Sequence, residues 1–231
     1  MLTLVSYPGL FGLADNNPYG LKVFAFLRLA GLDFRHEHVL DVSAAPRGQL
    51  PYILDDGVAV GDSDTIIAHL IRTRGLAIDE ELTAAQRDTD LLVRRALDDL
   101  YWVMSYSRWK DDRYWPQFRQ ALLGAVPRED AAALLEGARQ YNFTRYHHQG
   151  IGRYEPDAAY ARGLADLEVL ARLVPEEGFV FGPAPRSLDA GLYGFLANIW
   201  SYPIETPLKA FVDSCPNLVA HCRAMHARVS G

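Results

Sequence analysis

In the first third of the chain, hydrophobic positions follow strand and helix periods in turn. Residues 2–7 form a short, largely apolar run of strand length, and residues 34–40 are predicted as a second strand. Between them, Asn17 followed by Pro18 signals a helix start, because Asn caps helix N-termini and Pro suits the first helical position. The segment that follows is apolar on nearly every side, which predicts a helix buried between layers and ending near Gly31.

A hairpin and a second helix follow. Residues 52–54 and 58–60 flank Asp55-Asp56-Gly57, a strong turn signal between two apolar runs. Asp62-Ser63 then opens a segment whose apolar residues recur at helical spacing. The predicted order is β-α-β followed by β-β-α, which is the order of elements in a thioredoxin-like domain.

Beyond residue 75 the strand signals nearly vanish. Thr83, with Gln86 three residues later, forms a capping box that opens a long helix running to about Trp109. Further helical segments, separated by breakers such as Pro127, are predicted around 118–123, 131–148, 158–174, 188–200 and 217–229. We therefore expect an α/β thioredoxin-like N-terminal domain, residues 1–76, and an all-α C-terminal domain, residues 82–231.

Composition narrows the class of protein. The chain has 231 residues, of which 49% are hydrophobic, enough for two small domains with real cores. The formal net charge of −6 argues against nucleic acid and anionic membranes as main partners. No apolar run reaches the ~18–20 residues of a membrane-spanning helix, and the N-terminus lacks a signal-peptide pattern. We expect a cytoplasmic protein.

Neither the cysteines nor the histidines suggest a disulfide or a metal site. Cys215 and Cys222 are expected in one helix, ~10 Å apart along its axis, which is too far for a disulfide. His147 and His148 are adjacent, so they point about 100° apart on a helix and have no ligand cluster around them. No metal is expected.

Two motifs carry the functional argument. In Gln49-Leu50-Pro51-Tyr52-Ile53, Pro51 precedes a short strand, where it cannot donate a ladder hydrogen bond and a cis peptide bond fits. Such a bond would turn the Leu50 backbone outward to pair with an extended peptide. Asp62-Ser63 begins a helix, whose unpaired N–H groups and positive dipole end favour a carboxylate. Together they predict a site for a small charged peptide.

These features resemble the glutathione S-transferase superfamily over essentially the whole chain. The resemblance is closest to the bacterial branch that is similar to metaxin and the failed axon connections protein. It is carried by residues 17–23, 27–32, 50–53, 101–102, 107–109 and 215–219. It implies glutathione as co-substrate, bound through Leu50, Pro51, Asp62 and Ser63, a small electrophile as the second substrate, and a homodimer.

The resemblance also implies where the thiol of glutathione is activated. In serine- and cysteine-type members the activating residue directly precedes the Pro-aromatic pair, and here that position holds Asn17. Its NH₂ group can donate a hydrogen bond but cannot act as a nucleophile, which excludes thiol exchange through this residue. Gly20 occupies the position of a possible second cysteine. Tyr7, at the end of the first strand, is the second candidate, as in tyrosine-type members. A plain N-cap and a packed tyrosine are the structural alternatives.

Ser63 is expected to bind the γ-glutamyl carboxylate, with Asp62 near enough to take the ammonium group. A helix N-cap is the alternative for Ser63, and the upstream Leu50-Pro51 favours binding. Asp64 adds a negative charge that would weaken capture of a carboxylate.

The helix that ends near Trp109 is expected to line the pocket for the electrophile. Tyr101, Met104, Ser105 and Arg108 share one of its faces at i, i+3, i+4 and i+7 spacing. Arg108 would meet an acidic acceptor or a carboxylate of glutathione, and ordinary core packing is the alternative for this face.

The sequence thus predicts a glutathione S-transferase-like protein that binds glutathione and transfers its thiol to a small electrophile. The alternative is a non-catalytic binding or scaffold protein of metaxin-like type. The missing hydroxyl or thiol at Asn17 favours that alternative, whereas the retained motifs around Leu50 and Ser63 favour the enzyme.

Overall fold

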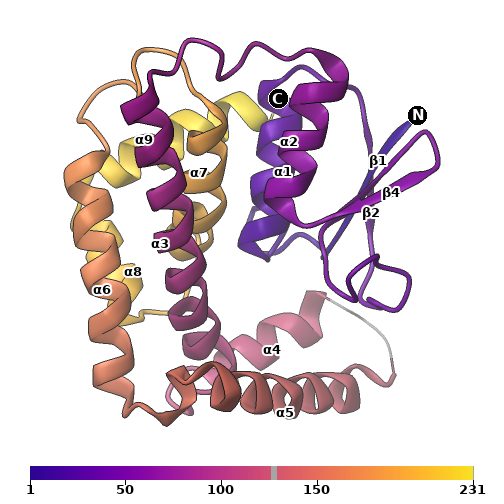
Figure 1. Ribbon diagram of the computed structural model, residues 1–231. Helices are drawn as coiled ribbons and strands as arrows, with labels where there is room; N and C mark the ends of the chain where they lie inside the picture. The colour runs from indigo at the N-terminus through magenta and orange to yellow at the C-terminus, as the bar shows by residue number, and fades with distance from the viewer. Residues whose placement is uncertain (126–128, 231) are drawn as a thin grey trace.

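The computed structural model describes residues 1–125 and 129–230 and has an α/β part beside a helical part (Figure 1). The four strands are β1 (Leu2–Ser6), β2 (Arg35–His38), β3 (Tyr52–Asp55) and β4 (Val58–Gly61). They form one sheet in the order β2-β1-β3-β4, with β2 parallel to β1, and with β3 antiparallel to both β1 and β4. With α1 (Pro18–Leu29) and α2 (Ser63–Arg74), this is the predicted thioredoxin-like order.

Strand β1 is buried along its whole length because both faces of the sheet are covered. Leu2 and Leu4 pack in the main core, which also contains the apolar side chains of α1 and α2. Val5 belongs to a separate cluster with Ala45 and Leu50, which come from the segment between β2 and β3. That segment has turns and bends instead of a helix, and it carries the chain to the cis Leu50–Pro51 peptide bond.

The helical part begins with α3. Its helices are α3 (Ala84–Trp109), α4 (Trp115–Ala125), α5 (Ala131–Gln149), the 3₁₀ helix η1 (Ile151–Arg153), α6 (Pro156–Leu173), α7 (Ser187–Trp200), α8 (Pro207–Asp213) and α9 (Pro216–Val229). The capping box of Thr83 and Gln86 is confirmed, and the short helix α8 was not predicted. Pro127, a predicted breaker, lies outside the described residues.

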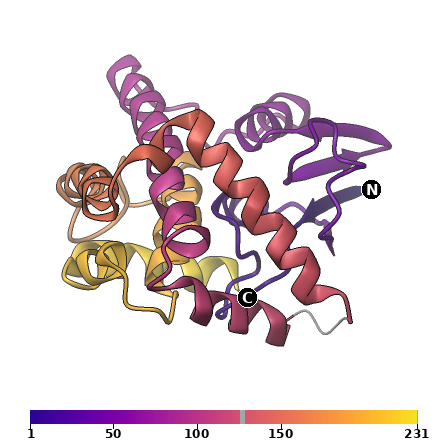
Figure 2. The same ribbon diagram turned by 90° about the horizontal axis from the view of Figure 1, so that it is seen from below.

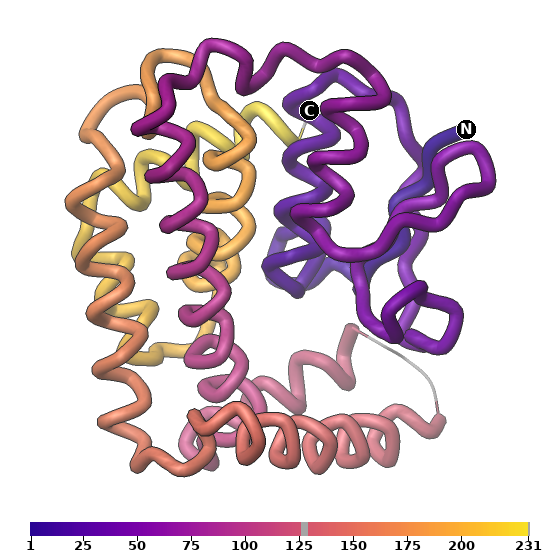
Figure 3. Tube along the Cα trace, viewed as in Figure 1, coloured from indigo at the N-terminus to yellow at the C-terminus, as the bar shows by residue number. Residues whose placement is uncertain are grey.

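The two parts are connected by residues 75–83, which cross from α2 to α3 at the top of Figure 3. Their division at residues 76 and 82 stays a prediction. Helix α7 packs along α1, and its residues 187–199 are all buried. Helices α4 and α5 extend from the lower end of α3 beneath the α/β part, as Figures 1 and 2 show. The predicted buried helix at Asn17 therefore lies between the sheet and α7.

Helix α7 begins at a carboxylate that serves the fold. Asp189 is fully buried and accepts a hydrogen bond from the backbone N–H of Arg186 at 2.8 Å. Nε2 of the buried His221 lies 3.0 Å from the same carboxylate. These contacts tie the start of α7 to α9.

Several expected absences concern only the part of the chain that is described. Within residues 1–125 and 129–230, no helix is long and apolar enough to cross a membrane. In those same ranges no three His, Cys, Asp or Glu side chains gather as a metal site. Cys215 and Cys222 are both free thiols.

Candidate functional site

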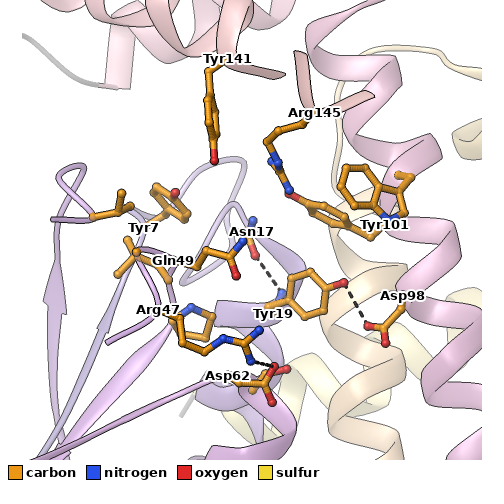
Figure 4. Close-up of a pocket in the computed structure, with 16 residues that line it drawn as sticks. Tyr7, Asn17, Tyr19, Arg47, Gln49, Asp62, Asp98, Tyr101, Tyr141 and Arg145 are labelled. Atoms are coloured by element: carbon orange, nitrogen blue, oxygen red, sulfur yellow. Dashed lines mark hydrogen bonds and ion pairs between the residues drawn. The ribbon is translucent and has the colours of Figure 1, made fainter. Parts of the chain in front are cut away.

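A cavity of about 420 Å³ lies between the α/β part and helices α3 and α5 (Figure 4). Small-molecule sites typically measure about 300–1,000 Å³. One wall consists of the segment before β3 and the N-terminal ends of α1 and α2. The cavity brings together most of the predicted site residues, namely Tyr7, Asn17, Leu50, Pro51, Asp62, Ser63 and Tyr101.

Three residues predicted for the electrophile pocket lie elsewhere. Met104, Ser105 and Arg108 follow Tyr101 along α3, but they are buried in the core and do not line this cavity. The Ser105 hydroxyl, for example, is hydrogen-bonded to the buried hydroxyl of Tyr146 at 2.7 Å. The core-packing alternative is the one that the structure shows for these three residues.

Arg108 supports the site from behind. Its guanidinium donates to the backbone carbonyl oxygens of Asn16 and Asn198, each at 2.7 Å. It also lies 4.9 Å from the ring centre of Tyr202. Burial lowers the pKa of this arginine. Through these contacts Arg108 holds the loop that leads to Asn17 against α7, and it has no direct access to a ligand in the cavity.

Asn17 combines a structural contact with a free side of its amide. Its Oδ1 accepts the backbone N–H of Tyr19 at 3.0 Å, which confirms the predicted N-cap. Its own backbone N–H donates to Oδ1 of the buried Asp15 at 2.6 Å. The rest of the side chain lines the cavity (Figure 4), so the NH₂ group is available as a donor.

Tyr7 lies on the same cavity. Burial, together with the nearby Tyr101 and Asp15, raises the pKa of Tyr7 to about 12. The phenol therefore stays protonated at neutral pH and acts as a hydrogen-bond donor. Both candidates for thiol activation are in reach of one ligand, and the geometry leaves the choice between them open.

At the start of α2, Asp62 caps the helix and Ser63 faces the cavity. Oδ1 of Asp62 accepts from the backbone N–H of Thr65 at 3.0 Å, so Asp62 is the N-cap. Ser63 occupies the first helical position and lines the cavity. The N-cap alternative for Ser63 is therefore wrong. Oδ2 of Asp62 pairs with Arg47 at 3.2 Å, at the cavity rim.

Comparison with known sequence families identifies the family of this chain. The family of glutathione S-transferase N-terminal domains matches residues 18–114, and the family of C-terminal domains matches residues 163–225. The chain is 31% identical over 227 residues to isoprene-epoxide–glutathione S-transferase of Rhodococcus sp. (strain AD45), covering 95% of each protein. The chain belongs to the glutathione S-transferase family.

The chain is also similar to two proteins that are not named as transferases. Failed axon connections of Drosophila melanogaster is 29% identical over 92% of this chain, which spans 54% of that protein. Metaxin-1 of Bos taurus is 23% identical over 96% of this chain and 73% of its own length. The predicted relation to metaxin-like proteins is confirmed.

Solved structures agree on the fold. The beta-etherase LigF from Sphingobium sp. strain SYK-6 has a TM-score of 0.64 at 17% identity, over 99% of this chain and 97% of that chain. A glutathione S-transferase from Methylobacillus flagellatus KT with glutathione bound has a TM-score of 0.57 at 16% identity, over 100% of this chain and 98% of that chain. At these identities the likeness concerns the glutathione S-transferase fold.

The charge of Asp64 is balanced in this transferase fold. Its Oδ1 receives hydrogen bonds from Lys22 Nζ and Arg94 Nη1, both at 2.6 Å. Burial alone would raise its pKa, but the two cations outweigh burial and lower it. Asp64 does not line the cavity, and its charge is compensated by Lys22 of α1 and Arg94 of α3. The expected weakening of carboxylate capture by Asp64 stays a prediction, which this compensation opposes.

Sequence reasoning missed much of the cavity. The lining residues that it did not assign to the site include Tyr19, Arg47, Gln49, Asp98, Trp102, Tyr141 and Arg145. Arg47 and Gln49 directly precede the Leu50-Pro51 motif, so their position in the chain was a usable signal. Tyr141 and Arg145 lie one turn apart on α5, and nothing in their spacing distinguishes them from an ordinary helix surface.

Proposed function

We propose that this chain conjugates glutathione to a small electrophile. One observation carries the proposal: the N-terminal ends of α1 and α2 and the segment before β3 meet at a single cavity. Helix N-termini stabilise anions through unpaired N–H groups and the helix dipole. A peptide that bears a carboxylate at one end and a thiolate near its centre suits two such ends placed side by side.

Glutathione would bind mainly through the α/β wall. Its γ-glutamyl carboxylate would accept hydrogen bonds from the Ser63 hydroxyl and the first turn of α2. The side chain of Leu50 is buried in its own cluster, so its backbone is the part that would pair with the peptide. The ammonium group of glutathione would lie near two carboxylates of this cavity. One belongs to Asp62, which also pairs with Arg47, and the other to Asp98.

The thiol would lie at the start of α1. A free cysteine thiol has a pKa of about 8.5, and each unit of lowering needs about 1.4 kcal/mol. A helix N-terminus supplies about 0.3–1 kcal/mol. A hydrogen bond from Asn17 or Tyr7 to the anion adds about 1.5–3 kcal/mol. Together these are enough to make the thiolate abundant near neutral pH without a nucleophilic side chain.

The electrophile is proposed to be an epoxide. The Rhodococcus relative, at 31% identity, is named for an epoxide substrate. The wall opposite the thiol is largely aromatic, with Tyr101, Trp102 and Tyr141 on α3 and α5. Such a wall suits a small, weakly polar molecule.

Replacement of Ser63 by Ala is expected to weaken glutathione binding about 10- to 100-fold, because a hydrogen bond to a charged group contributes about 1.5–3 kcal/mol. Calorimetric titration with reduced glutathione measures the change. Ser214→Ala, at an exposed serine at the end of α8, is the matched control and should bind as the wild type does.

Two results would contradict these assignments. Unchanged affinity in Ser63→Ala would remove Ser63 from the binding site. A folded wild-type protein that fails to bind glutathione at millimolar concentrations would overturn the proposed enzyme and favour the non-catalytic metaxin-like alternative. The homodimer and the cytoplasmic location stay predictions.

A further inference from the structure

Arg145 is an unusual residue on the electrophile side of the cavity. It is half-buried, and its guanidinium lies 5.0 Å from the ring centre of Trp102, 5.7 Å from that of Tyr141 and 6.0 Å from that of Tyr101. Its Nη1 donates to Oδ1 of Asn142 at 3.0 Å. Aromatic rings hold a guanidinium in place while removing part of its water.

The charge of Arg145 is not balanced by a carboxylate. Among the residues described, none of the Asp and Glu side chains lies within 4.0 Å of its guanidinium, whereas Arg47 pairs with Asp62 on the opposite wall. Asp98, which lines the cavity from α3, accepts a hydrogen bond from the Tyr19 hydroxyl at 3.1 Å. A half-buried cation that has no carboxylate partner is left to interact with a ligand that supplies negative charge.

The position of Arg145 indicates which atom of a ligand would carry that negative charge. Figure 4 shows its side chain reaching from α5 to the hydroxyl end of Tyr101, across the cavity from Asn17. An electrophile between them would have its carbon facing the thiol and its leaving atom facing Arg145. Arginine only donates hydrogen bonds, so when it donates to the Tyr101 oxygen the phenol proton remains for a ligand.

We propose that Arg145, together with Tyr101, binds the oxygen of an epoxide and stabilises the alkoxide that forms when the thiolate opens the ring. The inference rests on the proposed function and adds to it the group that assists departure of the oxygen. The carbon–sulfur bond forms as one carbon–oxygen bond breaks, and the electron pair of that bond stays on oxygen. The alkoxide then takes one proton from the Tyr101 hydroxyl, which solvent restores.

Electrophiles with different leaving groups separate this role from simple positioning. An alkyl iodide releases iodide, a stable anion that needs neither a proton nor a strong hydrogen-bond donor. The ratio of kcat/KM for 1,2-epoxybutane to that for 1-iodobutane therefore isolates the help given to the departing oxygen. Both conjugates with glutathione are quantified by mass spectrometry.

In Arg145→Met we expect this ratio to fall roughly 10²-fold, the usual cost of removing one donor to a developing oxyanion. Arg145→Lys should recover part of the loss, because it keeps the charge but not the planar donor fork. Arg223→Met is the matched control. Arg223 lies on α9, outside the cavity, with its guanidinium 5.9 Å from the ring centre of Trp200, and the ratio of this variant should equal that of the wild type.

Other outcomes overturn the assignment in distinct ways. An unchanged ratio in Arg145→Met, with equal losses of kcat/KM for both electrophiles, would show that Arg145 only shapes the cavity. No change in kcat/KM for either electrophile, or a wild-type protein that conjugates the iodide but not the epoxide, would refute the assignment while leaving the transferase intact. A wild-type protein that forms neither conjugate would overturn the proposed function and this inference together.

Discussion

The Asp15→Asn variant is expected to gain stability relative to the wild-type protein steadily as the pH rises from about 5 to about 8. Asp15 is fully buried beneath the start of α1, and its Oδ2 has no hydrogen-bond partner among the described residues. Burial raises the pKa of Asp15 to about 8, although hydrogen bonds from Ser6 and from the backbone N–H groups of Asn17 and Tyr7 oppose the rise.

The sign of the effect follows from proton binding. In the unfolded chain an aspartate has a pKa of about 3.9, so above that value the unfolded chain has released a proton that the native Asp15 still holds. The free energy of unfolding therefore falls by about 1.4 kcal/mol per pH unit between about 4 and about 8 from this residue alone. Asn has no proton to release, so the variant lacks this slope.

Denaturant unfolding of both proteins at about pH 5, 6.5 and 8 measures the difference directly. Asp33→Asn, at an exposed carboxylate after α1, is the control and should differ from the wild type by a nearly constant amount. A pH-independent difference for Asp15→Asn would show that Asp15 is ionised in the native protein. Neutral Asp15 would leave the buried guanidinium of Arg108 unbalanced behind Asn17, which favours an anionic thiol there.

Gly194→Ala is expected to lower the free energy of unfolding by about 3 kcal/mol, at the upper end for overpacked sites. A Cβ at this position of α7 would lie 2.5 Å from the carbonyl oxygen of Pro18 and 2.9 Å from the backbone nitrogen of Lys22. Both are main-chain atoms of α1, so the conflict can be relieved only by moving the helix. That movement would displace Asn17 and weaken glutathione binding as well.

Thermal and denaturant unfolding, with Gly137→Ala as control, test this prediction. Gly137 lies in the middle of α5, is exposed, and has no neighbour within 4 Å of an added Cβ. Alanine there should raise stability by about 0.5–1 kcal/mol through helix propensity. Equal effects of the two substitutions would mean that α1 and α7 are not in close contact.

Parts of the fold were predictable because they depend on residues a few positions apart. The cap at Asn17, the capping box at Thr83 and the hairpin turn at Asp55-Asp56-Gly57 are short-range hydrogen-bonding patterns. Helix α8 was missed because its seven residues are too few to show a period, although Thr206 caps it.

The predicted site residues that line the cavity also belong to short-range motifs, and those that were misplaced depend on long-range packing. The Leu50-Pro51 and Asp62-Ser63 motifs were recognised locally, and both line the cavity. Arg108 was misplaced for a geometric reason. Seven residues bring it back to the face of Tyr101, but they also carry it about 10 Å along the α3 axis, away from the cavity and into contact with Asn198 of α7.

The sequence by itself determined the family and the order of elements, and it pointed to the wall proposed to hold glutathione, since each rests on local patterns or motifs. Only the tertiary structure decided which residues form the opposite wall and which charges are left unbalanced. Arg145 and Tyr141 reach the cavity because α5 runs beneath the α/β part, and the charge of Asp64 is compensated because Lys22 and Arg94 both contact it. Such long-range encounters depend on how helices pack, and no local spacing encodes them.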